Sequence, residues 1–277
     1  MTVEPAYGSA ILLMLGALGL FLVLFLIYLV RSQQGSKDDS ASPATRFSLR
    51  RIAGYEATTE GLALSAETGR AVHTSPGTGS VGAQGIGTAS TLAGMAIVES
   101  MARVSAITGA PVQATTNDAI AYALTDNAIR RGYRRAGWSL ESEGGEVLFL
   151  THADPLAYVA GAAEIIQEQK VSSAVAVGSF GPEVLFLTEA HRRQGAHQIV
   201  GSSDAQALAL INITADHTIV GEEIFASGAY LERRTTHTAS LLAQDGLRWV
   251  LILLIIVGFV VANVFGIDWT TVLGIIP

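Results

Sequence analysis

Two uncharged apolar segments, one near each end of the chain, constrain this sequence more than any other feature. The first runs from Ala10 to Val30 and the second from Trp249 to Ile267, and neither contains Lys, Arg, Asp or Glu. A helix of about 20 residues spans about 30 Å, the thickness of a bilayer core. Lipid offers the backbone no hydrogen-bond partner, so such segments cross it as helices. The sequence therefore predicts transmembrane helices over residues 10–30 and 248–267.

Each segment has an alternative interpretation. The first could be a cleaved signal peptide, but residues 1–9 carry no Lys or Arg and the segment is longer than a signal h-region. The second could be a buried core helix, but its uncharged run is rich in Ile, Leu and Val. Only 15% of the chain is charged, against about a quarter in soluble domains, which favours lipid contact for both.

Basic residues flank the two segments on their inner sides only. The outer flanks, residues 1–9 and 268–277, contain no Lys or Arg, whereas the inner flanks carry Arg31, Lys37, Arg46, Arg50, Arg51, Arg233, Arg234 and Arg248. The positive-inside rule then predicts a two-pass protein of the cell membrane, with both termini outside as short tails. The lipid bilayer is the first expected partner, and the middle of the chain is expected in the cytoplasm.

The chain between the segments divides into a linker and one domain. Residues 31–46 have almost no apolar side chain to bury and predict a flexible linker. Residues 47–247 remain for a cytoplasmic domain, which begins with a helical lead-in that ends at Gly69. The absence of cysteine excludes disulfides and zinc-thiolate sites, and the net charge of −7 argues against nucleic acid as a partner.

Short Val-rich runs alternate with Ala-rich segments in this domain, each of which repeats apolar residues three or four apart. One such helical face comprises Leu156, Val159, Ala163 and Ile166. The pattern predicts an α/β fold, a Rossmann-like parallel sheet of about five strands with helices on both faces. The predicted strands are Ala71–Ser75, Val112–Thr116, Glu146–Thr151, Ser173–Gly178 and Gln198–Ser202.

The last part of the domain, Ala215 to Leu247, breaks this alternation. Residues 219–231 have no clean period and are available for a protein–protein contact. Thr238 to Leu247 is expected to be helical and to continue directly into the second membrane helix. In the first membrane helix, the small residues Gly16 and Gly19 would permit close packing against another helix.

A glycine-rich loop follows the first predicted strand. Gly77, Gly79 and Gly82 match G-x-G-x-x-G, a pattern in which backbone N–H groups approach a phosphate. However, several more residues precede the next helix cap, and the candidate ribose-binding acid, Asp118, follows too late in the sequence. A nucleotide is therefore a possible cofactor, and a loop without a ligand is the plainer interpretation.

Polar residues at the other predicted strand ends are further ligand-binding candidates. Most are also explained as helix caps. Acid–base chemistry would need several of His73, Asp118, His152 and Asp154 in one cleft. The histidines lack metal-ligand spacing and no metal site is expected. The candidates at these strand ends are Thr116, Asp118, His152, Asp154, Ser179 and Ser202.

Two charged clusters have structural and functional interpretations. Residues 130–135 contain four arginines at a helix end, where they oppose the helix dipole or contact anionic headgroups. Glu222 and Glu223 are expected to be solvated or to bridge subunits rather than to catalyse.

Four segments of the domain resemble a bacterial family of membrane proteins with a domain of unknown function, found in green filamentous bacteria and their relatives. The segments are Phe47–Ile52, Asn127–Gly137, Ala153–Glu164 and Val220–Leu231. The resemblance implies a membrane location and brings no established activity or site residue.

These observations favour a non-enzymatic function. We expect a membrane-anchored scaffold or assembly component that forms a homo-oligomer or binds another membrane protein. The alternative is a membrane-tethered sensor that binds a nucleotide or anionic metabolite at the loop 77–87.

Overall fold

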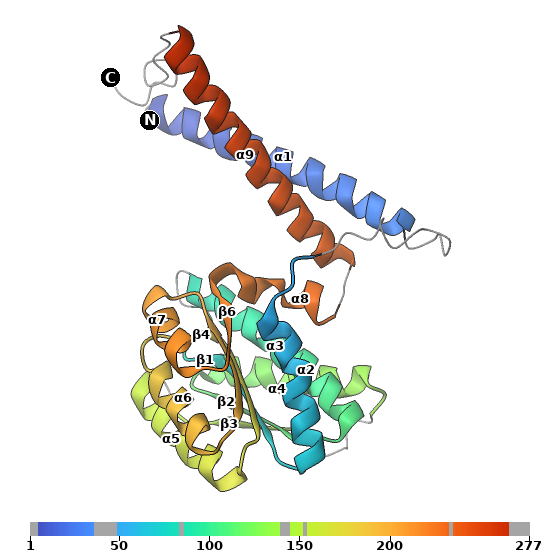
Figure 1. The fold of residues 1–277 in the computed structure, drawn as a ribbon, viewed down its shortest axis with the longest axis vertical. Coiled ribbons are helices and arrows are strands. Elements are labelled where there is room, and N and C mark those ends of the chain that lie inside the picture. Colours follow the sequence, from blue (N-terminus) through green and yellow to red (C-terminus); the bar gives the residue numbers. More distant parts are fainter. Residues whose placement is uncertain are drawn as a thin grey trace. The chain divides into compact units, whose positions relative to one another are not determined.

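The computed structural model describes residues 5–35, 49–82, 86–138, 145–151, 154–232 and 235–265 (Figure 1). The chain divides into two compact units. One is Arg50–Glu232, and the other combines the parts before Arg50 and after Glu232. The first unit is shorter than the predicted domain of residues 47–247 because residues 235–247 belong to a helix of the second unit.

The first unit contains a six-stranded sheet in which every neighbouring pair is parallel. Its strand order is β3-β2-β1-β4-β5-β6, so the order reverses between β1 and β4. The predicted α/β class is confirmed, and the five predicted strands all form. The strands are β1 (Val72–Gly77), β2 (Val112–Thr116), β3 (Gly145–Phe149), β4 (Ser173–Ser179), β5 (His197–Ser202) and β6 (His217–Val220).

The estimate of about five strands is corrected by β6, which lies in the last part of the predicted domain, where the alternation breaks. It has four residues and occupies one edge of the sheet, where it pairs with β5 alone. Only Ile219 of β6 is buried. A strand this short at an edge presents too few alternating positions to be recognised in the sequence.

Helices cover both faces of the sheet. Reversal of the strand order places the connections on opposite faces, since parallel crossovers are right-handed. One face carries α2, α3 and α4, and the other carries α5, α6 and α7 (Figure 1). The helices are α2 (Ala53–Thr68), α3 (Ile86–Thr108), α4 (Ala119–Arg135), α5 (Pro155–Gln169), α6 (Val184–Arg193) and α7 (Ala205–Thr214).

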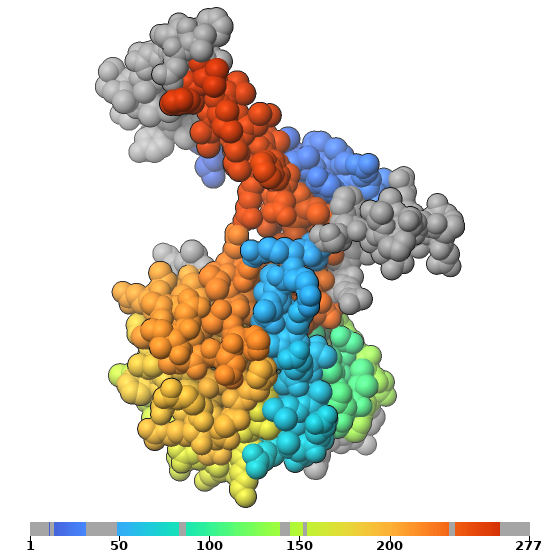
Figure 2. Space-filling model, in the orientation of Figure 1, coloured from blue at the N-terminus to red at the C-terminus, as the bar shows by residue number. Residues whose placement is uncertain are grey.

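Helix α2 confirms the predicted helical lead-in, which ends at Gly69 in a left-handed conformation. It packs against the β4–β6 half of the sheet, and Figure 2 shows it in light blue as a continuous strip on the surface. Aspartates cap three of the helices, as expected for Asp118 and Asp154. Asp118, Asp154 and Asp204 each accept hydrogen bonds from backbone N–H groups in the first turn of α4, α5 and α7.

A seam of close backbone contact joins β1, β4 and α3. A Cβ atom on Gly178 would lie 1.8 Å from the Pro76 carbonyl oxygen, and one on Gly94 would lie 2.2 Å from the Val177 carbonyl oxygen. Gly77, with φ +108°, would place a Cβ 2.3 Å from the Ser179 carbonyl oxygen. Side chains are therefore excluded from this glycine seam, so that α3 lies directly on the two central strands.

The segment after β6 folds back onto the start of the unit through η2 (Gly221–Ala226) and α8 (Ser227–Tyr230). Arg50 forms an ion pair with Glu223, and the Tyr230 hydroxyl donates to the Arg50 carbonyl. Tyr55 stacks on Tyr230 with ring centroids 5.2 Å apart and donates to the Glu223 carbonyl at 2.7 Å. We call these four residues the terminal clamp. The segment expected to be available for a protein contact thus makes extensive contacts within its own unit.

The second unit contains two long helices, α1 (Pro5–Gly35) and α9 (Thr235–Phe265), each long and apolar enough to cross a membrane. Residues 238–247 and the described part of the second apolar segment form one continuous helix, α9, as predicted. Helix α1 extends through residues 31–35, which were expected to be linker. Residues 36–46 of that linker lie outside the described residues.

The two helices contact each other through Leu24 and Tyr28 of α1. An ideal Cβ at Gly246 of α9 would lie 3.5 Å from Leu24 Cδ1 and 3.6 Å from the Tyr28 ring. Gly16 and Gly19, which were expected to permit close packing, have no described atom within 4 Å of their Cβ positions. The contact at Gly246 therefore involves Leu24 and Tyr28 and not these two glycines.

The glycine seam predicts unequal effects of two alanine substitutions in α3. Gly94→Ala places a methyl group against the Val177 carbonyl and should destabilise the unit by about 1–3 kcal/mol, the usual effect of overpacking. Gly87→Ala is the matched control, because its nearest atom is at 3.4 Å and alanine favours the helix. Thermal unfolding of the two variants in detergent measures the difference, and equal melting temperatures would contradict the seam.

Candidate functional site

The point where the strand order reverses lies between β1 and β4, and ligands of open parallel sheets bind at the carboxyl ends of such strands. The glycine-rich loop follows β1 here, and Ser179 ends β4. Of the predicted site residues, Gly77, Gly79 and Ser179 lie together here, and Asp118 reaches the same loop at Val81.

Backbone N–H groups of the loop donate to protein acceptors. Those of Thr78 and Gly79 donate to the Ser179 carbonyl at 2.7 and 3.2 Å. That of Gly77 donates to Ser75 Oγ at 3.1 Å, and that of Gly82 donates to Thr88 Oγ1 at 3.1 Å. A phosphate cradle needs such groups to point outward at the anion, so in this conformation residues 77–82 do not form one.

Two carboxylates lie against the loop. Glu183 accepts from the Thr78 hydroxyl at 2.5 Å and from the Gly181 N–H at 2.9 Å. Asp118 accepts from the Val81 N–H at 3.4 Å and from the Ala121 N–H at 2.9 Å. Negative charge on both sides raises the free energy of a bound anion. Asp118 thus has two structural roles: it caps α4 through Ala121, and it holds the loop through Val81.

The Ser179 side chain lies between the loop and the start of α3. Its hydroxyl lies 2.5 Å from the ideal Cβ position of Gly79 and 3.4 Å from that of Gly87. Ser179 is half-buried, whereas Phe180 next to it is buried. Gly79 is thus required for packing against Ser179, an explanation independent of any ligand.

The remaining candidates do not converge on this loop. Thr116 is fully buried, and its hydroxyl has no hydrogen-bond partner among the described residues. Ser202 is also buried and donates to the Phe180 carbonyl at 2.8 Å. Asp154 is exposed and caps α5, while His152 lies outside the described residues. The acid–base arrangement considered from the sequence thus gains no support from Asp118 and Asp154, which cap different helices.

A buried polar network crosses the other face of the sheet. His191 Nε2 of α6 lies 2.9 Å from His73 Nδ1, and His73 Nε2 lies 2.9 Å from Thr115 Oγ1. The Tyr158 hydroxyl of α5 lies 2.7 Å from Thr115 Oγ1 and 2.7 Å from Ser75 Oγ. All five side chains are essentially inaccessible to solvent. Sequence analysis missed the network because its members come from four elements.

Burial holds both histidines of this network in the neutral form. It lowers the pKa of His73 to about 4 and, together with repulsion from His73, it lowers the pKa of His191 well below the ordinary value. Burial also raises the pKa of Tyr158 to about 12. The network therefore consists of neutral groups that hydrogen bond to one another and places no charge in the interior of the unit. This arrangement fits a structural role.

The two charged clusters are largely paired within the unit. Arg131 and Arg135 both contact Glu99, at 2.9 and 2.5 Å, and Arg130 contacts Asp126 at 2.8 Å. Glu223 belongs to the terminal clamp. Arg131 and Arg135 therefore join α4 to α3, and the three ion pairs reduce the positive charge offered to lipid headgroups.

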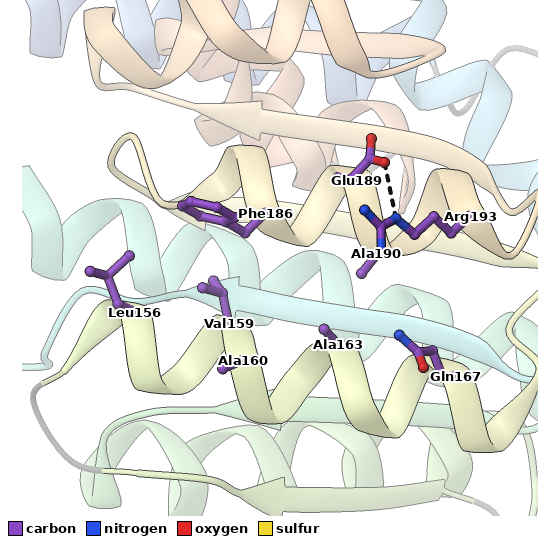
Figure 3. A pocket seen from close by; sticks show the side chains of 9 residues that line it. All are labelled: Leu156, Val159, Ala160, Ala163, Gln167, Phe186, Glu189, Ala190 and Arg193. Atoms are coloured by element: carbon purple, nitrogen blue, oxygen red, sulfur yellow. Dashed lines mark hydrogen bonds and ion pairs between the residues drawn. The ribbon is translucent and has the colours of Figure 1, made fainter.

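A surface groove lies between α5 and α6, with a volume of about 370 Å³ (Figure 3). Leu156 and Phe186, each 59% exposed, stand at one end, and Arg193 with Glu189 stands at the other. Its walls also include Val159, Ala160, Ala163, Gln167 and Ala190. The helical face predicted from Leu156 to Ile166 is therefore split, because Ile166 enters the core and Leu156 faces solvent. Spacing alone could not separate these two positions.

The geometry defines a class of protein: a three-layer α/β domain joined to two long apolar helices. A family model matches residues 13–273, and the chain belongs to this family, which is described as a domain of unknown function, DUF6754. Membership of a family without an assigned activity is thus confirmed, and the description names no bacterial group. No curated protein and no solved structure matches the chain.

The buried histidines predict acid sensitivity. Their pKa values are lower in the folded than in the unfolded state, so the unfolded state binds more protons below pH 6.5, and stability falls as the pH falls towards 4. His73 alone corresponds to about 3 kcal/mol over this window. His191→Gln should flatten the dependence of melting temperature on pH, and an unchanged profile would contradict the assignment. His237→Gln, at an exposed position, is the control.

Proposed function

We propose that this protein is a membrane-anchored, non-enzymatic scaffold that assembles with further copies through a cytoplasmic Rossmann-like domain. The observation that carries the proposal is the groove between α5 and α6, whose apolar end is exposed on a unit that already has a complete core. Burying an exposed Leu or Phe side chain gains about 1.5–3 kcal/mol, so Leu156 and Phe186 favour a contact that covers them.

Anchoring in a membrane is supported by where the two apolar helices meet. Tyr28 lies near the end of the apolar part of α1, and Gly246 lies just before the apolar part of α9 begins at Trp249. Their contact sets one end of both apolar stretches at a common level, as two helices crossing one bilayer require. The basic flanks adjoin this level, which favours the cytoplasmic side for it.

The described residues favour assembly over catalysis. His73 is enclosed in the buried network, and Asp118 and Asp154 serve as caps of separate helices. The groove, by contrast, is an open surface trough with mostly apolar walls. Apolar surface of this kind on helices is typical of protein contacts.

The proposal predicts that the full chain in mild detergent has a protein mass above that of one copy, measured by light scattering. Phe186→Glu should weaken association at least about tenfold, because it places a charge where an apolar side chain is buried. Ile120→Glu is the matched control, since Ile120 is also exposed, at 53%, but lies on α4 across the sheet. A strict monomer at high concentration would remove the basis of the proposal.

A sensor for a nucleotide or anionic metabolite at residues 77–87 is the second candidate. Its support is the position of the loop where the strand order reverses. The internal hydrogen bonds and the flanking carboxylates act against it, so we place it second.

This ranking predicts the outcome of a ligand screen. A ligand at 100 times its Kd stabilises a protein by about 2.7 kcal/mol, a clear shift in melting temperature. ATP, GTP, NAD and inorganic phosphate should give no such shift with the full chain. Gly79→Val should lower the melting temperature without any ligand, because its side chain meets Ser179. A shift with one nucleotide that Gly79→Val abolishes would reverse the ranking.

A further inference from the structure

The groove between α5 and α6 is polarised along its length, and this property restricts how it can be covered. The two helices run in the same direction, so Leu156 and Phe186 meet at one end while Gln167 and Arg193 meet at the other (Figure 3). One end is therefore apolar and the other is polar and charged.

We propose that the occupant of this groove is the same face of a second copy, related by a two-fold axis parallel to α5 and α6. The proposal rests on the proposed function and specifies its contact. A two-fold axis perpendicular to the helices would place the apolar end on Arg193 and Glu189. An axis parallel to the helices places apolar on apolar and lays α5 of each copy over α6 of its partner.

Charge complementarity supports this arrangement. Helix α5 carries the exposed Glu164, which makes no ion pair with any residue of the described ranges, and α6 carries the exposed Arg193. Glu164 lies three residues before Gln167, which faces Arg193 across the groove, so Glu164 and Arg193 stand within about one helical turn of each other. The parallel axis lays Glu164 of one copy over Arg193 of the other, twice in the dimer.

Arg193 is positioned to accept a second carboxylate. Its Nε donates to Glu189 Oε1 at 3.0 Å within the same helix, and Figure 3 shows the guanidinium turned back along α6 above Ala190. A guanidinium has five N–H donors, so contact with Glu189 leaves others for Glu164 of a second copy. The small side chains of Ala160, Ala163 and Ala190 leave space for Phe186 of that copy.

Charge reversal tests the pairing in the full chain. Glu164→Arg and Arg193→Glu should each weaken association at least about threefold, because each creates two like-charge contacts. The double variant restores opposite charges and should return the affinity to within about twofold of wild type. Because the intrahelical pair with Glu189 stays broken in the double variant, a purely structural effect of Arg193 would not be rescued.

Cysteine cross-linking tests the axis, and the chain suits it because it contains no cysteine. Ala160→Cys on the groove wall should give a covalent dimer when membranes are treated with a short bis-maleimide, since the two Ala160 positions lie on opposite sides of the axis, too far apart for a direct disulfide. Ala123→Cys, an exposed alanine on α4, is the matched control and should give none. Melting temperatures confirm that both variants are folded.

The outcomes separate the two proposals. An oligomer that Phe186→Glu disrupts, but that shows neither rescue nor the Ala160 cross-link, would overturn the two-fold arrangement and leave the scaffold. A complex whose mass reveals a different protein in the groove would overturn the second copy as occupant. A strict monomer would overturn both.

Discussion

Close contact of backbone with backbone at the centre of the sheet is the constraint on which the rest of the α/β unit depends. Gly77, Gly94 and Gly178 let β1, β4 and α3 approach without intervening side chains. This approach brings the Ser179 carbonyl within reach of the N–H groups of Thr78 and Gly79. Gly77 belongs both to this seam and to the G-x-G-x-x-G pattern, so the contact that builds the sheet also closes the loop onto the protein and occupies N–H donors that an anion would use.

Local signals in the sequence were sufficient for most of the fold. Val-rich runs located five strands. Aspartates located helix starts such as that after Asp154, because a capping side chain binds backbone N–H groups only two or three residues away in the sequence. Strand β6 escaped, since an edge strand of four residues has little pattern. The uncharged segments also located α1 and α9, although α1 extends further at both ends, from Pro5 to Gly35.

The candidate site was less predictable because its properties arise from contacts between distant segments. Nothing near His73 in the sequence indicates His191, which lies 118 positions later and meets it only where α6 packs on the sheet. Leu156 and Ile166 share a helical repeat, yet Leu156 is exposed at the groove and Ile166 is buried in the core. Sequence spacing identified which residues could face a neighbour, and the packing of helices decided which of them did.

The terminal clamp has a mechanical consequence for the α/β unit. The clamp joins the start of the unit to the segment near its end. It consists of the Arg50–Glu223 ion pair, the hydrogen bond from the Tyr230 hydroxyl to the Arg50 carbonyl and the Tyr55–Tyr230 stack. Tension applied between the two connections of the unit would act first on these contacts. The six strands would carry that tension only after the clamp opens, so the sheet is shielded from forces transmitted along the chain.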